Sequence, residues 1–130
     1  MHEELPPWPD ARPALFTHAL PLRIAPMNLL AVYTTVSSAD AARRMARALV
    51  EQKLAACAQI GEIESFYSWQ GALANEREFR ILFKTTEARW PEVEAAIREL
   101  HDYELPAIHA VALQHVHAPY GRWIEEGCSP

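Results

Sequence analysis

Glycine and cysteine are scarce in this sequence of 130 residues, and each scarcity excludes a class of site. The four glycines stand alone, at positions 61, 71, 121 and 127, so a glycine-rich loop that cradles phosphate is excluded. The two cysteines, Cys57 and Cys128, form neither a disulfide framework nor a zinc-finger spacing. They favour a reducing compartment, and we expect a cytoplasmic protein.

Long apolar runs and dense groups of basic residues are also missing. No apolar stretch has the length of a membrane span or a signal peptide, so we expect no membrane partner and no targeting segment. The formal net charge is −5 and no Lys/Arg cluster opposes it, so we expect no nucleic-acid partner either. The sequence lacks a Ser-His-Asp order and a paired-acid motif, and we therefore predict that the protein is not an enzyme.

Proline divides the chain into two parts. Residues 1–26 hold six of the ten prolines, which remove backbone donors and fix φ, so a regular helix or central strand is not expected there. We interpret residues 1–26 as a proline-rich extension and residues 27–130 as one domain, since the chain is long enough for one core. The six prolines are Pro6, Pro7, Pro9, Pro13, Pro21 and Pro26.

The domain alternates between the period of a strand and the period of a helix. Residues 29–36 form a β-favouring run, and a capped helix follows from Ser38 to about Leu54. Residues 57–69 and 78–85 alternate in polarity and predict a long hairpin, in which Gly61 is expected to mark a bend or bulge. A second helix opens at Thr86 and Glu87 with Pro91 in its first turn, residues 108–114 form a last strand, and a short helix follows Pro119.

This order of elements predicts an α+β fold. Strand, helix, strand, strand, helix and strand, with a short C-terminal helix, is the order of a ferredoxin-like (βαββαβ) antiparallel sheet with two covering helices. A fold of this kind does not by itself indicate a function.

Several short motifs carry a family resemblance. In order along the chain they are Leu54-Ala55-Ala56-Cys57, Tyr67-Ser68-Trp69-Gln70-Gly71, Lys84-Thr85-Thr86, His101-Asp102-Tyr103-Glu104-Leu105-Pro106, and Tyr120 with Trp123. In this order and spacing the chain resembles the divalent-cation tolerance protein CutA family over about residues 29–125. Two departures stand out, because the family commonly has Pro where this chain has Asp102, and the turn around Gly61 is about one residue shorter.

The resemblance implies a homotrimer whose long hairpin extends into neighbouring subunits, in an architecture similar to the PII signalling trimers. An aromatic hairpin would leave apolar area in water unless a partner covered it, which agrees with that expectation. We expect Phe66, Trp69 and Trp123 at the trimer interface. The resemblance also implies a link to copper and other divalent cations.

Three residues are the candidate metal ligands. Cys57 offers the softest ligand and suits copper(I), His101 suits the same borderline metals, and Glu104 adds an oxygen ligand. The alternative is structural: Cys57 is a small buried residue, and His101 caps a helix C-terminus. We expect a bound copper or other divalent metal not to be required for folding.

His115 and His117 form a separate local candidate for metal binding. Residues two apart in an extended segment project to the same side, so the His-Val-His segment could chelate one ion, and three copies could converge on a trimer axis. The alternative is a pair of solvated side chains. The sequence leaves both interpretations open.

Four polar residues are assigned to a ligand cleft between subunits: Tyr67, Glu78, Lys84 and Tyr103. Glu78 and Lys84 share one strand face, and a charge pair at a subunit junction could position a small-molecule ligand. The alternative is an ion pair between subunits that sets the register of the trimer.

Two hypotheses of function follow. The first is a homotrimeric, copper- or divalent-metal-binding protein that takes part in the response to metal ions. The second is a PII-like signalling or scaffold trimer that binds a small molecule in clefts between subunits. A small cofactor-free enzyme is a third alternative, with no catalytic motif to support it.

Overall fold

The computed structural model describes residues 28–130, so the prediction of a proline-rich extension lies outside the described residues. The fold is built on one four-stranded sheet in the order β2-β3-β1-β4, with every neighbouring pair antiparallel. The strands are β1 (Leu29–Val36), β2 (Cys57–Trp69), β3 (Ala72–Thr86) and β4 (Ile108–Ala112). This topology confirms the predicted ferredoxin-like fold.

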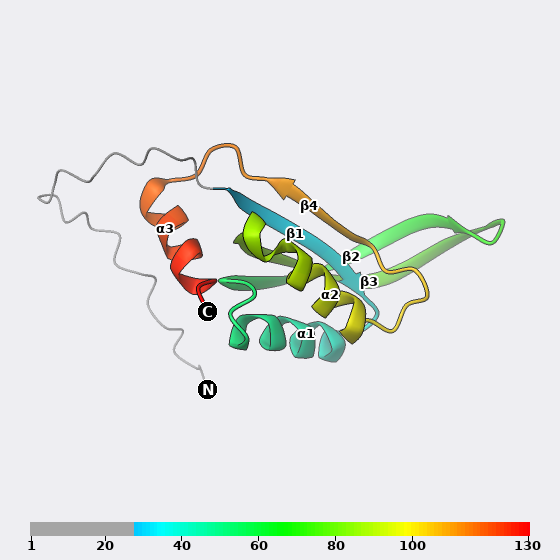
Figure 1. Ribbon diagram of the computed structural model, residues 1–130. Helices are drawn as coiled ribbons and strands as arrows, with labels where there is room; N and C mark the ends of the chain where they lie inside the picture. Colours follow the sequence, from blue (N-terminus) through cyan, green and yellow to red (C-terminus); the bar gives the residue numbers. More distant parts are fainter. Residues whose placement is uncertain (1–27) are drawn as a thin grey trace, which may run out of the picture.

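Two helices cover one face of the sheet, and a third lies across one end of it (Figure 1). The covering helices are α1 (Ala39–Glu51) and α2 (Trp90–Leu100), and a 3-10 turn at Glu87–Arg89 precedes α2. The third helix, α3 (Ala118–Gly127), packs against β1 and β3. The other face of the sheet is not covered by α1 or α2, and we call it the open face.

The core lies between the sheet and the two covering helices. Alternate residues of β1 and β3 point toward the helices because successive strand side chains project to opposite faces. Their apolar side chains meet the inward stripes of α1 and α2, which excludes water from one continuous cluster. Its fully buried members include Val32, Val36, Leu49, Ile81, Phe83, Val93 and Ile97.

Helix α1 begins as predicted and ends earlier than predicted. The Ser38 hydroxyl oxygen accepts a hydrogen bond from the Ala41 N–H at 3.0 Å, which caps the first turn. At the other end Lys53 takes a φ of 58°, and the Leu54 N–H reaches back to the Leu49 carbonyl at 2.9 Å. This is a Schellman end, which turns Leu54 into the core instead of prolonging the helix.

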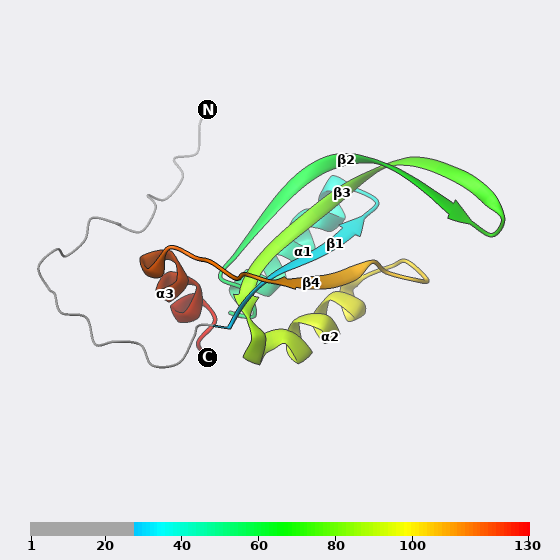
Figure 2. The same ribbon diagram turned by 90° about the horizontal axis from the view of Figure 1, so that it is seen from above.

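The β2–β3 hairpin is longer and more regular than predicted. Its strands pair one-for-one from Cys57–Lys84 to Trp69–Ala72, so the predicted bulge at Gly61 is wrong. Gln70 and Gly71, with φ of 51° and 80°, form the tight turn whose twist matches the two strands. The hairpin runs well beyond the helix layer, so polar residues occupy both of its faces there (Figure 2).

Small differences at the C-terminal end have local causes. A second apolar cluster lies between β1 and α3, with Leu29, Ile124 and Cys128 as its buried members. The last strand ends at Ala112 instead of Gln114, because the Leu113 side chain packs against this second apolar cluster. The predicted terminal helix is present, but it begins at Ala118, slightly earlier than predicted, because Pro119 fits its first turn.

Candidate functional site

Cys57 lies at the end of the sheet that α3 crosses. It is the first residue of β2, its side chain is half-buried, and its Sγ lies 3.9 Å from the Tyr120 Oη. Tyr120 itself stacks on Trp123, with ring centroids 5.7 Å apart. Sequence reasoning missed Tyr120 as a neighbour of Cys57, because the two residues are 63 positions apart along the chain.

His101 lies at the opposite end of the sheet, in the loop between α2 and β4. Its side chain is fully buried. The Nε2 lies 2.8 Å from the Thr35 carbonyl oxygen, and the Nδ1 accepts the Tyr103 N–H at 3.2 Å. In that arrangement the Nε2–H donates to Thr35, so both ring nitrogens are engaged within the chain. These contacts favour the structural interpretation of His101.

The three predicted metal ligands do not come together within one chain. Cys57 pairs with Lys84, whereas His101 contacts Thr35, which pairs with Arg80. Four residues of strand separate those positions, or about 13 Å, in addition to the distance across the sheet. Glu104 is exposed in the loop after His101. Among residues 28–130, His, Cys, Asp and Glu form no group of three that could hold a metal ion.

The open face of the hairpin carries a cluster of phenols and carboxylates. The Tyr103 hydroxyl donates to the Glu78 Oε2 at 3.0 Å, and Glu78 is only 6% exposed. Tyr67 and Glu76 lie on the same face, as the strand register requires. Burial and the Glu78 carboxylate raise the pKa of Tyr103, and desolvation and Glu76 raise the pKa of Tyr67. Three of the four predicted cleft residues therefore lie together.

The fourth predicted cleft residue, Lys84, lies apart from the others. It is half-buried on the open face, six residues from Glu78 along β3, which corresponds to about 20 Å. Its neighbours across the ladders are Cys57 and Ala31. Neither of them is a carboxylate that could pair with the ammonium group.

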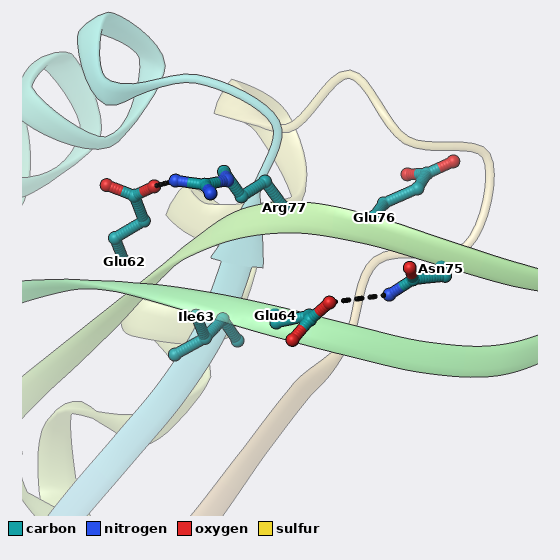
Figure 3. A pocket seen from close by; sticks show the side chains of 6 residues that line it. All are labelled: Glu62, Ile63, Glu64, Asn75, Glu76 and Arg77. Atoms are coloured by element: carbon teal, nitrogen blue, oxygen red, sulfur yellow. Dashed lines mark hydrogen bonds and ion pairs between the residues drawn. The ribbon is translucent and has the colours of Figure 1, made fainter.

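A shallow hollow of about 390 Å³ lies on the hairpin (Figure 3). Arg77 points to Glu62 and forms an ion pair with it, and the Asn75 Nδ2 donates to the Glu64 Oε2 at 3.3 Å. Four of the five polar side chains that line the hollow are therefore paired with one another. This pairing makes the hollow a poor candidate for a ligand site.

The predicted interface residues fall into two environments. Phe66 and Trp69 lie on opposite faces of the hairpin and are 64% and 41% exposed. Trp123 is half-buried on α3, against the second apolar cluster. His115 and His117 are both exposed in the segment that precedes α3.

Tyr120 predicts an alkaline limb in the pH dependence of stability. Burial and the neighbouring Cys57 raise the pKa of Tyr120 to about 12, whereas tyrosine in an unfolded chain ionises near pH 10. The unfolded chain therefore loses its proton first, and stability that is constant below about pH 10 falls as the pH rises toward 12. Urea unfolding between pH 8 and pH 11.5 measures this limb.

Tyr120→Phe should flatten that limb without abolishing it, because the pKa values of Tyr67 and Tyr103 are raised as well. Cys57→Ser keeps Tyr120 but removes one cause of its raised pKa, so it should flatten the limb less than Tyr120→Phe does. Identical pH slopes in the parent and in Tyr120→Phe would contradict the prediction.

No helix within residues 28–130 is both long enough and apolar enough to span a membrane.

A family model described as CutA1 divalent ion tolerance protein matches residues 30–127. The divalent-cation tolerance protein CutA of Thermococcus kodakarensis is 35% identical over 98 residues, which cover 75% of this chain and 94% of that protein. Its counterpart in Thermus thermophilus is 38% identical over 96 residues, which cover 73% and 93%.

Solved structures of similar proteins have the same fold. CutA from Synechococcus elongatus superposes with a TM-score of 0.77 at 35% identity, covering 82% of this chain and 95% of that one. A protein from Archaeoglobus fulgidus, described as a periplasmic divalent cation tolerance protein CutA, superposes with a TM-score of 0.76 at 33% identity, covering 78% and 99%. The match of the family model and these relatives together show that the chain belongs to the CutA1 divalent ion tolerance protein family.

Proposed function

We propose that the protein is a homotrimer that binds copper or other divalent metal ions and takes part in the cellular response to them. The membership of the chain in the divalent ion tolerance family supports the metal part of this proposal. The observation that carries the trimer is the aromatic surface of the hairpin. We propose further that the protein is cytoplasmic and that it catalyses no reaction.

The hairpin exposes three large apolar side chains near its turn. Phe66, Trp69 and Leu73 are 64%, 41% and 77% exposed, and all three lie within a few residues of the hairpin turn at Gln70 and Gly71. That end of the hairpin protrudes beyond the helices (Figure 2). Phe66 and Leu73 lie on one face of the hairpin and Trp69 on the other. Exposed aromatic and apolar side chains of this kind are enriched in protein interfaces. A second copy of the chain would remove them from water.

For the metal, we propose Cys57 as the central ligand. Its thiol is the softest ligand type in the chain, and it is only half-buried. Within residues 28–130 its one side-chain hydrogen bond is the long contact to Tyr120. A second and a third ligand would come from another subunit or from exogenous groups, since residues 28–130 of one chain supply no group of three. His101 and Glu104 keep a place in the proposal as predicted ligands, although the hydrogen bonds of His101 disfavour it.

The second candidate is a PII-like trimer that binds a small molecule between subunits. The clustering of Tyr67, Glu78 and Tyr103 on the open face favours this alternative. Such a cleft would take a ligand with hydrogen-bond acceptors for the phenols or a cation for the carboxylate. Metal effects on cells would then be indirect.

The decisive experiment has two parts. Light scattering at low micromolar concentration should give the mass of three chains, and the mass of one chain would refute the trimer. Anaerobic copper(I) titration of the reduced protein should then show stoichiometric binding that Cys57→Ser abolishes. The comparison variants are His101→Ala, Glu104→Ala and the double substitution His115→Ala/His117→Ala.

Each titration result assigns the function differently. Loss in Cys57→Ser alone supports the thiol site, and loss only in the double substitution moves the site to the His-Val-His segment. Weak binding in every form, together with a trimer, would favour the second candidate.

A further inference from the structure

We infer that a second copy of this chain supplies the cation that Glu78 lacks, and that this cation is the ammonium group of Lys84. The inference rests on the homotrimer proposed above and names a contact within it. The hydrogen-bonded pair of Tyr103 and Glu78 would then bind the ammonium group of Lys84 from the second copy. Glu78 and Lys84, both on the open face, have no ionic partner within residues 28–130.

Glu78 is a buried carboxylate without a counter-ion. It is 6% exposed, and the one hydrogen bond to its side chain within residues 28–130 comes from the neutral Tyr103 hydroxyl. Among those residues no Lys, Arg or His nitrogen lies within 4.0 Å of it. A buried charge is costly unless it is paired, and a single neutral donor offsets only part of the lost hydration.

The nearest cation on the same strand face points elsewhere. Arg80 is two residues from Glu78 on the open face, but its guanidinium carbon lies 5.8 Å from the centre of the Tyr33 ring. Arg77, on the opposite face of the hairpin, is already paired with Glu62. The counter-ion must therefore come from outside residues 28–130 or from a rearranged Arg80, and the experiment below distinguishes Lys84 of a second copy from Arg80.

Lys84 likewise lacks a counter-ion within residues 28–130. It is half-buried on the open face, and no carboxylate of residues 28–130 lies within 4.0 Å of its ammonium nitrogen. The roughly 20 Å of strand between the two residues prevents Lys84 from reaching Glu78 of its own chain. The same separation allows the acidic end of one copy to meet the basic end of another.

The order of charges along β3 indicates how two copies meet. On the open face the acids Glu76 and Glu78 occupy the protruding hairpin, whereas Arg80 and Lys84 occupy the body of the sheet. A hairpin laid across the sheet of the next copy is a head-to-tail contact, and repetition of such a contact closes a ring. Tyr67 and Trp69 share the face of Glu78 and would exclude water from the ion pair, which strengthens it.

Charge exchange tests this contact. The dissociation constant of the assembly would be measured by analytical ultracentrifugation on dilution, or in low guanidinium where dilution alone does not dissociate it. Glu78→Lys and Lys84→Glu should each raise that constant by about 100-fold, because each places like charges together. The double variant Glu78→Lys/Lys84→Glu restores an opposite-charge pair and should return to within about tenfold of the parent.

Neutral variants and a control complete the design. Glu78→Gln and Lys84→Met change shape very little and serve where a charge reversal fails to fold by circular dichroism. If the two side chains form an ion pair, the double variant Glu78→Gln/Lys84→Met should weaken assembly by less than the sum of the two single effects. Arg80→Glu is the matched control, because it reverses another open-face cation, and it should disturb assembly much less than Lys84→Glu does.

Four results would overturn the inference. They are an unchanged constant in both single variants, no recovery in the double variant, an Arg80→Glu effect equal to that of Lys84→Glu, or an effect of Glu78 variants alone. The last result would point to a small cationic ligand. A trimeric parent with any of these results would keep the proposed assembly and reject this contact, whereas a monomeric parent would reject both.

Discussion

Replacing Phe83 by alanine is expected to lower the free energy of unfolding by about 3–5 kcal/mol. The Phe83 side chain is fully buried on β3, in the core between the sheet and the two covering helices. Its removal leaves a cavity that residues on rigid elements close only in part, so the loss exceeds the transfer energy of the missing atoms. Urea unfolding at several protein concentrations measures the effect and separates it from association.

Phe66→Ala is the matched control for that experiment, because it deletes the same side chain from an exposed position. Phe66 is 64% exposed on the hairpin, so its loss should hardly change the stability of the dissociated chain. It should weaken association instead, if the hairpin lies in the interface. Equal losses in the two variants at every concentration would contradict the assignment of Phe83 to the core and Phe66 to the interface.

His101→Leu is expected to cost about 2–4 kcal/mol in protein stripped of metal. The substitution leaves the Thr35 carbonyl and the Tyr103 N–H without the partner that each now has. Unpaired polar groups in a part-buried setting lose their hydration without compensation. Chelator-treated samples in urea unfolding provide the measurement, because a structural role predicts a loss without any metal.

The control for His101 is His115→Leu, which places the same side chain at an exposed position. That variant should lie within about 0.5 kcal/mol of the parent. If metal-free His101→Leu were equally stable, the hydrogen bonds of His101 would not hold the loop, and its role as a metal ligand would regain support. Asp102, 73% exposed and 3.9 Å from the His101 Nδ1, should tolerate substitution by Asn.

The loop that His101 holds also positions Tyr103. His101 accepts the Tyr103 N–H, and the two rings lie 4.8 Å apart. The Tyr103 hydroxyl in turn donates to Glu78. We therefore expect His101→Leu to weaken assembly as well as folding, if the ion pair inferred above forms.

Patterned segments could be predicted closely, whereas segment ends could not. The bounds of β1 and β2 agree with the expectation, because β1 is a continuous β-favouring run and β2 alternates in polarity with a period of two. β3 was predicted to begin at Glu78 but begins at Ala72, since its polar residues pair with β2 outside the core. The early end of α1 depends on the φ of Lys53, a residue that carries no turn signal in the sequence.

The candidate site follows the same division. The sequence alone determined the fold class, the family resemblance and the residue types that could bind a metal or a ligand, because these depend on local pattern and on motif order. Only the tertiary structure decided which of them meet. Strand pairing places Cys57 and His101 at opposite ends of the sheet and brings Tyr103 to Glu78. Those distances depend on register and on loop paths, which join residues far apart in the chain and leave no local pattern in the sequence.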